Sequence, residues 1–358
     1  MKLVVDARGI NDSGIGVYIK NLVPHFNLKY KGTFKYIVNP QGVLALCDLG
    51  VERNNIIIVE FTRFSWKNLF YLNQYITEKE MVFFPCLTVL PVFSCSEFVS
   101  TIHDLCPIRM SKHFGIKISI VFYLVMLFQI LKSSRIIAIS EFTKQEVFNC
   151  FPFLSKKKCK LVYNGVVKRA QSRSKSEISG IKPIKPYFLC VGNIKPHKNI
   201  LNFANFFSEL SKHNNDFDLV VVGSAEGFIT GEKRDIPNSD NIIFTGYVGD
   251  DELAMLYKNA ALFISPSLYE GFGLPIFEAV NFEIPIFLSD IPVYRELAPK
   301  GTLFFEPNSF SDFDSKVGYA LNNKASYDKK EFLDSFSWEN TAKSTIEVIV
   351  NHENITSK

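Results

Sequence analysis

Short apolar segments of strand length alternate with longer segments of helical length along this chain. This alternation predicts parallel β-sheets covered by helices, because parallel neighbours need a crossover connection. The predicted strands of the first half are 3–6, 36–38, 56–59, 81–84, 100–103 and 135–139. Those of the second half are 187–191, 219–223, 242–245, 261–265 and 286–289. We therefore predict an α/β protein of two doubly wound, Rossmann-like domains that face each other across a cleft.

The length of 358 residues also favours two domains over one. The stretch between the two strand series is rich in Lys, Ser and Pro and shows no apolar period, which is typical of a linker. We predict an N-terminal domain over 1–168, a linker over 169–186, a C-terminal domain over 187–335 and a final helix over 336–358.

Charge divides unevenly between the halves. Up to residue 170 the chain holds 22 Lys and Arg against 11 Asp and Glu, and the remainder holds 18 against 25. A basic first half indicates an anionic partner, for which phosphorylated substrate, lipid headgroups and nucleic acid are candidates. The sequence contains no nucleic-acid recognition motif, so we expect no nucleic-acid partner.

Seven cysteines are dispersed singly and form no metal-ligand spacing, which favours free thiols in a reducing compartment. The first residues run directly into a predicted strand and do not resemble a signal peptide. We expect a cytoplasmic protein and no metal site.

Residues 118–131 are almost entirely apolar and lie between Lys117 and Lys132. As a helix they span about 21 Å, short of a hydrocarbon core of about 30 Å. A helix that is apolar on all sides is usually buried in a protein core, which is the favoured interpretation. The alternative is an interfacial helix that dips into an anionic membrane, with its neighbouring lysines among the headgroups.

The strand at 261–265 leads into a loop with two glycines, and Pro275 then opens a predicted helix. The glycines allow close backbone approach, and the amides at a helix start attract a diphosphate, so Gly271, Phe272, Gly273 and Leu274 are predicted ligand-binding residues. Glu270 and Glu278 flank this anion site.

A second loop of this kind follows the strand at 187–191. Gly192-Asn193-Ile194-Lys195-Pro196-His197-Lys198-Asn199 again leads from a strand into a helix. The two strings together resemble the E-x7-E signature and the donor-phosphate motif of glycosyltransferase family 4, whose members have the GT-B fold and retain anomeric configuration. His197 stands where many members have arginine.

Three further elements match this family in order. Gly14 and Gly16 resemble its N-terminal glycine loop, and His103 with Asp104 resembles the histidine that contacts the donor sugar. Residues 336–339 resemble the start of the last helix, which crosses back to the first domain in GT-B enzymes. The variants at 103–105 and 196–199 resemble the bacterial mannosyl- and rhamnosyltransferase branch.

The resemblance implies specific roles for these residues. Glu270 and His103 act on the donor sugar, Glu278 accepts from the nucleotide ribose, and Asn193, His197 and Lys198 bind the donor. The resemblance implies a nucleotide-sugar donor, for which GDP-mannose is the first candidate, and a glycan or lipid-linked acceptor. It implies neither a cofactor nor a metal.

Two other classes share these features. A nucleotide-sugar 2-epimerase of the same fold would use the same cleft, and a non-catalytic sugar-nucleotide or lipid-binding relative would be expected to lack Glu270 or Lys198. A hydrolytic glycosidase would use two carboxylates but would leave the phosphate-binding features without a purpose.

Overall fold

The computed structural model describes residues 3–29, 33–76, 80–167, 185–212, 216–224, 239–322 and 328–350. It divides into two compact units, and each is considered separately. Unit 1 consists of residues 1–108, 116–165 and 336–358, and unit 2 of residues 109–115 and 166–335. The predicted linker at 169–186 lies outside the described residues apart from its last two.

Unit 1 is built on a parallel sheet whose strand order is β3-β2-β1-β4-β5-β6-β7. Its strands are β1 (Leu3–Asp6), β2 (Phe34–Val38), β3 (Ile56–Ile58), β4 (Met81–Phe84), β5 (Glu97–Ile102), β6 (Arg135–Ala138) and β7 (Cys159–Leu161). The helices are α1 (Ser13–Lys29), α2 (Val43–Asp48), α3 (Asn68–Tyr71), α4 (Cys106–Arg109), α6 (Ile116–Lys132), α7 (Glu141–Cys150) and α14 (Trp338–Val350).

Unit 2 has a parallel sheet of order β10-β9-β8-β11-β12-β13. Its strands are β8 (Tyr187–Val191), β9 (Asp218–Val222), β10 (Ile242–Gly246), β11 (Leu262–Ser265), β12 (Ile286–Ser289) and β13 (Leu303–Phe305). The helices are α5 (Ser111–Phe114), α8 (Ile200–Ser211), α9 (Asp250–Asn259), α10 (Leu274–Asn281), α11 (Pro292–Leu297), α12 (Phe313–Asn322) and α13 (Lys329–Asp334).

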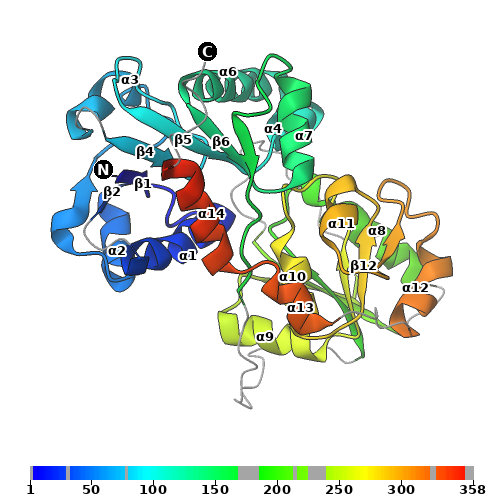
Figure 1. Cartoon of the computed structure of the whole chain (residues 1–358). Helices are drawn as coiled ribbons and strands as arrows, with labels where there is room; N and C mark the ends of the chain where they lie inside the picture. The colour runs from blue at the N-terminus through cyan, green and yellow to red at the C-terminus, as the bar shows by residue number, and fades with distance from the viewer. Residues whose placement is uncertain are drawn as a thin grey trace. The chain divides into compact units, whose positions relative to one another are not determined.

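The two parallel sheets with their helices confirm the predicted α/β class (Figure 1). The two strands that the sequence analysis did not identify, β7 and β13, each contain three residues and lie at a sheet edge. An edge strand is paired on one side only, so it needs no long apolar run to be stable.

Two apolar layers cover the two faces of the unit 1 sheet. The first joins α1, α2 and α14, with Leu22, Leu46 and Ile346 in one buried cluster. The second places α6 and α7 on the other face, with Met126 and Val147 in another cluster. Helix α14 is tied in by an edge-to-face contact between Trp338 and Tyr18, whose ring centroids lie 5.9 Å apart. Among the described residues, no helix is both long and apolar enough to cross a bilayer.

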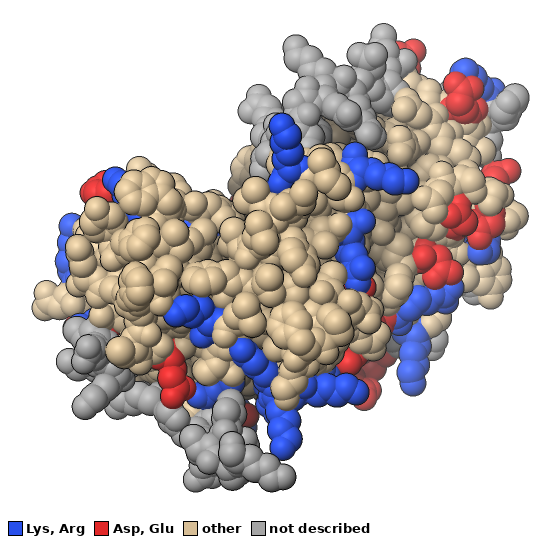
Figure 2. Space-filling view, turned by 90° about the horizontal axis from the view of Figure 1, so that it is seen from above, with Lys and Arg blue, Asp and Glu red and all other residues tan. Residues whose placement is uncertain are grey.

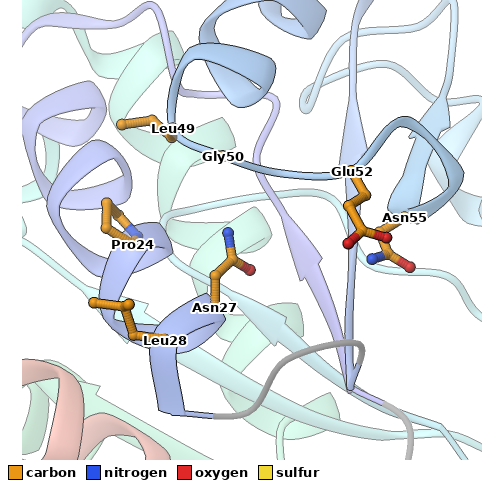
Figure 3. Close-up of a pocket in the computed structure, with 7 residues that line it drawn as sticks. All are labelled: Pro24, Asn27, Leu28, Leu49, Gly50, Glu52 and Asn55. Carbon is orange, nitrogen blue, oxygen red and sulfur yellow. The ribbon is translucent and has the colours of Figure 1, made fainter.

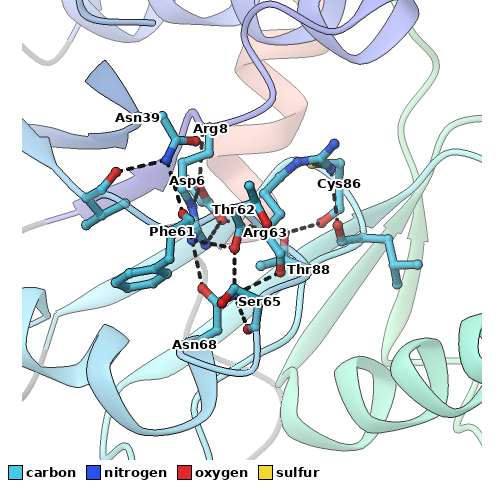
Figure 4. Close-up of polar contacts among 12 residues, drawn as sticks. Asp6, Arg8, Asn39, Phe61, Thr62, Arg63, Ser65, Asn68, Cys86 and Thr88 are labelled. Atoms are coloured by element: carbon cyan, nitrogen blue, oxygen red, sulfur yellow. Dashed lines mark hydrogen bonds and ion pairs between the residues drawn. The ribbon is translucent and has the colours of Figure 1, made fainter. Parts of the chain in front are cut away.

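A buried ion pair at the end of β1 organises the neighbouring loop (Figure 4). The guanidinium of Arg8 donates from Nε and Nη2 to the two carboxylate oxygens of Asp6, each at 2.8 Å, and neither side chain is exposed. Its Nη1 donates to Oδ1 of Asn68 at 2.7 Å. The Asn68 amide in turn donates to the carbonyls of Thr62 and Ser65 at 2.9 and 2.7 Å. The pair therefore fixes the path of the 61–68 loop.

Replacing Arg8 by methionine should leave the Asp6 carboxylate buried without its cationic partner. We expect a loss of about 3–5 kcal/mol in the free energy of unfolding, measured by urea denaturation. The control Lys212→Ala removes an exposed ion pair with Glu209 and should cost less than about 0.5 kcal/mol. A loss for Arg8→Met as small as that of the control would contradict the structural role of the pair.

Candidate functional site

The two sequence motifs of unit 2 meet at the point where its strand order reverses. Strands β8 and β11 are neighbours, although β9 and β10 lie between them in the sequence. Because the two strands are parallel, the loops that follow them leave the same edge of the sheet. In doubly wound sheets this edge, at this switch point, is where ligands bind. Lys198 follows β8 and Glu270 follows β11.

A direct ion pair joins these two residues. Lys198 Nζ lies 2.6 Å from Glu270 Oε1, and both side chains are largely buried. The same carboxylate oxygen accepts from Ser267 Oγ at 2.7 Å and from Tyr294 OH at 3.3 Å. Tyr294 OH also lies 2.6 Å from Ser265 Oγ. A carboxylate held from three sides has one orientation, so this arrangement can position a charge against a ligand.

The sequence analysis did not identify Ser267 or Tyr294. Tyr294 belongs to α11, just after β12, which is the next strand along the sheet. The rule that ligand-binding residues follow the carboxyl ends of parallel strands could have found it. Ser267 lies three residues before Glu270 in the loop already selected.

The surroundings of Glu270 lower its pKa. Burial acts to raise the pKa, but the positive charge of Lys198, together with His197 and the hydrogen bonds from Lys198 and Ser267, outweighs burial. Burial raises the pKa of Tyr294 well above its ordinary value, and the charge of Glu270 adds to this. At neutral pH Glu270 is therefore a carboxylate and Tyr294 a neutral donor.

His197 links the two loops through its backbone. Its carbonyl oxygen accepts from the amides of Leu268 and Tyr269, at 2.8 and 3.4 Å. The imidazole stacks on Phe114, with ring centroids 6.1 Å apart, and Nδ1 is buried with no hydrogen-bond partner among the described residues. Burial lowers the pKa of His197 to about 4, with Lys198 acting in the same direction and Glu270 opposing it. The ring is therefore neutral at pH 7, unlike an arginine.

The start of α10 is arranged for close approach to a ligand. Gly273 precedes the helix with φ +89°, a left-handed conformation that favours glycine, and a Cβ there would lie 2.8 Å from the Tyr294 ring. Phe272 is buried and stacks on Phe277 at 5.1 Å, so its backbone is what it can offer to a ligand. Because Pro275 has no amide hydrogen, an anion at this helix start would depend on Gly273 and Leu274.

Glu278 lies in the second turn of α10 and is held by a tyrosine from another helix. Tyr257 of α9 donates its hydroxyl to Glu278 Oε2 at 2.8 Å. The sequence analysis did not identify Tyr257, and no motif marks it.

Asn193, just after β8, accepts at Oδ1 from the amide of Ser224, 3.3 Å away. This bond joins the loops that follow β8 and β9.

His103 in unit 1 follows β5. Its Nε2 lies 2.7 Å from the carbonyl oxygen of Pro85, which follows the adjacent strand β4. Its ring makes an edge-to-face contact with Tyr18, with centroids 4.9 Å apart. Burial lowers the pKa of His103 to about 4, partly offset by the bond to Pro85. His103 is therefore neutral at pH 7 and lies against Tyr18, which follows Gly16 by two residues.

The sequence analysis placed Gly14 and Gly16 in a glycine loop. In the structure they belong to the first turn of α1, which begins at Ser13. The amide of Gly16 already donates to the carbonyl of Asp12 at 3.0 Å, as in a helix. A Cβ at Gly16 would lie 2.5 Å from the carbonyl oxygen of Ile10. Gly16 therefore lets the preceding turn fold tightly onto the helix. A Cβ at Gly14 would meet nothing within 4 Å.

A pocket of about 430 Å³ on unit 1 has no part in this constellation (Figure 3). It is lined by Pro24, Asn27, Leu28, Leu49, Gly50, Glu52 and Asn55. It contains none of the predicted site residues.

Comparison with known proteins points to one class. Residues 171–332 match the family model Glycosyl transferases group 1. Over 220 residues the chain is 27% identical to the O-antigen chain mannosyltransferase RfbU of Salmonella typhimurium, covering 61% of this chain and 59% of that protein. It is 29% identical over 164 residues to the serotype-specific mannosyltransferase WbdA of Escherichia coli, covering 44% of this chain and 20% of that protein. The match thus spans about three fifths of the length of RfbU and about one fifth of the length of WbdA.

Solved structures agree on the fold. The Anabaena protein Alr3699/HepE in complex with UDP-glucose matches with a TM-score of 0.70 at 16% identity, covering 98% of this chain and 99% of that chain. A glycosyltransferase from Rickettsia africae matches with a TM-score of 0.65 at 17% identity, covering 97% of each chain. This chain has two parallel sheets, and its likeness to these structures shows that its fold is GT-B. In the family match and in the relatives, the chain is similar to glycosyltransferases.

The two desolvated histidines predict how stability depends on pH. In the unfolded chain His103 and His197 take up protons near pH 6.5, whereas in the folded protein they resist protonation until about pH 4. The unfolded state therefore binds more protons in this window, so stability is lost as pH falls from 6.5 towards 4. The lowered pKa of Glu270 adds a loss only at the acidic end, as pH falls through its folded pKa.

Replacing either histidine by glutamine should flatten this dependence by an amount on the order of 2 kcal/mol between pH 7 and pH 5. Chemical denaturation of the wild type and both variants across this range measures it. At pH 8, where the imidazoles are neutral in both states, each variant should differ from the wild type only by a constant offset. Parallel stability curves over the whole range would contradict the neutral assignment.

Proposed function

We propose that this protein is a retaining glycosyltransferase that moves mannose or rhamnose from a nucleotide-sugar donor to a glycan or lipid-linked saccharide. GDP-mannose is the first candidate for the donor. The reaction would contribute to bacterial surface polysaccharide. The observation that carries this proposal is the ion pair between Lys198 and Glu270, which joins a phosphate-type loop to an acidic loop at the switch point of the sheet. The names of RfbU and WbdA, both mannosyltransferases, support the sugar.

In this proposal the bond between the anomeric carbon and the diphosphate oxygen breaks, and an acceptor hydroxyl forms the new bond on the same face. The electron pair of the broken bond leaves with the nucleoside diphosphate. Lys198 and the amides of Gly273 and Leu274 stabilise that developing negative charge. His197 is neutral, so its contribution is a hydrogen bond and not a charge. The proton of the acceptor hydroxyl leaves with the departing phosphate.

Glu270 would stabilise the positive charge that develops on the sugar ring and hold its hydroxyl groups. A carboxylate with a lowered pKa is a poor proton acceptor at neutral pH, so the role of general base does not suit it. Glu278, held by Tyr257, would accept from the ribose hydroxyls. His103 would contact the donor sugar as a neutral ring.

The proposal includes no metal and no cofactor, because Lys198 and the start of α10 supply the positive potential that a metal would otherwise provide. It places the protein in the cytoplasm, peripheral to the inner face of the plasma membrane, where a lipid-linked acceptor would be found. The basic balance of residues 1–170 supports an anionic surface as a partner.

A donor screen tests the function. The protein is incubated with GDP-mannose, dTDP-rhamnose and UDP-sugars, with and without a saccharide acceptor and with and without EDTA. We expect an acceptor-linked product of retained configuration, formed from GDP-mannose or dTDP-rhamnose and insensitive to EDTA. An epimerised free sugar from donor alone would instead identify a 2-epimerase. Donor binding without turnover would identify a non-catalytic relative.

Glu270→Gln should lower turnover by about two to three orders of magnitude, because it removes the charge while keeping the size of the side chain. The hydrogen bonds from Ser267 and Tyr294 can still be made, so the protein should remain folded by circular dichroism. Unchanged kcat in a folded Glu270→Gln variant would exclude the proposed role.

Lys198→Ala should weaken binding of the donor and of free nucleoside diphosphate by about 10- to 100-fold, the value of a charged hydrogen bond. Titration calorimetry measures both affinities. Lys195→Ala is the matched control, since Lys195 is an exposed lysine of the same loop and its removal should change affinity by less than about threefold. Equal effects of the two substitutions would show a general charge effect and not a phosphate contact.

A further inference from the structure

Helix α6 of unit 1 is apolar on the side that faces away from the protein as well as on the side that packs. On its inner face the side chains of Met126 and Ile130 are buried. On its outer side Val121 is 61% exposed and Leu124 55% exposed, and the other exposed apolar residues of the helix are Ile116, Ile118, Ile120 and Leu131. The expectation of a core helix therefore holds for one face only. Surface helices of water-soluble proteins normally place polar residues on the outer face.

The segment 64–71, which ends in α3 and is called the aromatic loop below, also exposes apolar side chains. Trp66 is 62% exposed, and Phe64, Phe70 and Tyr71 are exposed beside it. This loop is held in place from below, because the buried Asn68 amide binds the carbonyls of Thr62, Arg63 and Ser65 (Figure 4). The aromatic side chains are thus presented on a fixed backbone, which keeps the entropy cost of using them low.

Helix α6 and the aromatic loop form one continuous surface. Phe64 and α6 together line an apolar groove of about 350 Å³, whose residues are Phe64, Leu87, Lys117, Ile118, Val121, Phe122 and Val125. The 87–93 segment joins them, since the amide of Val92 donates to the carbonyl of Leu69 at 3.0 Å and Lys132 Nζ to the carbonyl of Val92 at 2.5 Å. Phe93, on this segment, is 75% exposed.

The charge around this surface is predominantly basic. Residues 61–76 and 116–140 contain no Asp or Glu, and both stretches contain basic residues, among them the exposed Lys67 and Lys117. Lys158 donates to the carbonyl of Ile130 at the end of α6 at 2.7 Å, which brings the exposed Lys156 and Lys157 close to the same end. Figure 2, which views the molecule of Figure 1 from above, shows a broad tan area on which blue lysine and arginine atoms cover more of the surface than red acidic atoms.

From these observations we propose that α6, the 64–71 loop and Phe93 form a docking surface for a bilayer that contains anionic lipid. Exposed Trp, Phe and aliphatic side chains enter the headgroup–acyl boundary, and the surrounding lysines contact the phosphates. A protein partner or a second copy would not by itself account for a surface on which both apolar stretches, 61–76 and 116–140, contain basic residues and no acidic ones. This inference deepens the membrane part of the proposed function by assigning it to particular residues.

The helix lies along the membrane in this arrangement and does not cross it. Its inner face is packed on the unit 1 sheet through Met126, Ile130 and Leu127. Insertion of the whole helix would remove these contacts, whereas contact through the outer face leaves them in place. A helix with one face on a protein and the other in the interface inserts only by the depth of its side chains.

Vesicle flotation of the full chain, without donor or acceptor, tests the surface. We expect binding to vesicles of phosphatidylcholine and phosphatidylglycerol, weak binding to phosphatidylcholine alone, and weaker binding at raised salt. Val121→Glu combined with Leu124→Glu should reduce the affinity about tenfold or more. Lys117→Gln with Lys156→Gln and Lys157→Gln should do so too, at roughly fivefold for each lysine that contacts the surface.

The matched control is Leu28→Glu combined with Leu44→Glu. These leucines are 83% and 71% exposed in α1 and α2, which cover the opposite face of the unit 1 sheet. The control pair should bind vesicles as the wild type does, and circular dichroism checks that all variants are folded. Equal binding by the two pairs, equal binding to neutral vesicles, or no binding by the folded wild type would overturn the proposal.

Light scattering separates the remaining alternative. A wild-type dimer that dissociates in the Val121→Glu and Leu124→Glu variant, with no vesicle binding by the wild type, would assign this surface to self-association and overturn membrane docking.

Failure of the docking proposal can be distinguished from failure of the proposed function. A protein that floats with vesicles but transfers no sugar contradicts only the function, and one that transfers sugar to a soluble acceptor but does not float contradicts only the docking surface.

Discussion

The candidate site of unit 2 depends on the parallel pairing of β8 with β11. This pairing brings together two loops that are separated by about 70 residues of sequence, and it makes both leave the same edge of the sheet. The ion pair between Lys198 and Glu270, the support from Ser267 and the bond between the His197 carbonyl and the 268–269 amides all follow from it. An antiparallel arrangement of the same strands would place the two loops at opposite edges.

Burial then sets the charge of each group at this edge. Glu270 stays ionised because Lys198 lies against it, whereas for the neighbouring His197 burial outweighs the opposing effect of Glu270. The two loops thus bring together the Glu270 carboxylate, the Lys198 ammonium group and the neutral ring of His197. In unit 1 the buried ion pair of Asp6 and Arg8 has a structural role. Each charge compensates the other, and Arg8 also fixes the loop that carries the exposed aromatic residues.

Several elements were predicted from the sequence with the observed bounds, among them β1, β4, β8 and β12. Buried parallel strands are continuous apolar runs, so their ends are marked by the first polar or glycine residue. Elements that depend on distant partners were less accessible. The edge strands β7 and β13 have no long apolar run, and the first turn of α1 includes glycines that local propensity assigns to a loop.

By itself the sequence determined the α/β class and the two motif loops, and it selected Lys198, Glu270 and Glu278 as candidate site residues, because strand periodicity and loop chemistry are local properties of the chain. Only the tertiary structure decided that Lys198 and Glu270 touch, that Tyr294 and Tyr257 hold the two carboxylates, and that α6 is buried on one side and exposed on the other. The physical reason is that contact, desolvation and exposure depend on which segments the sheet brings together, and composition does not record this.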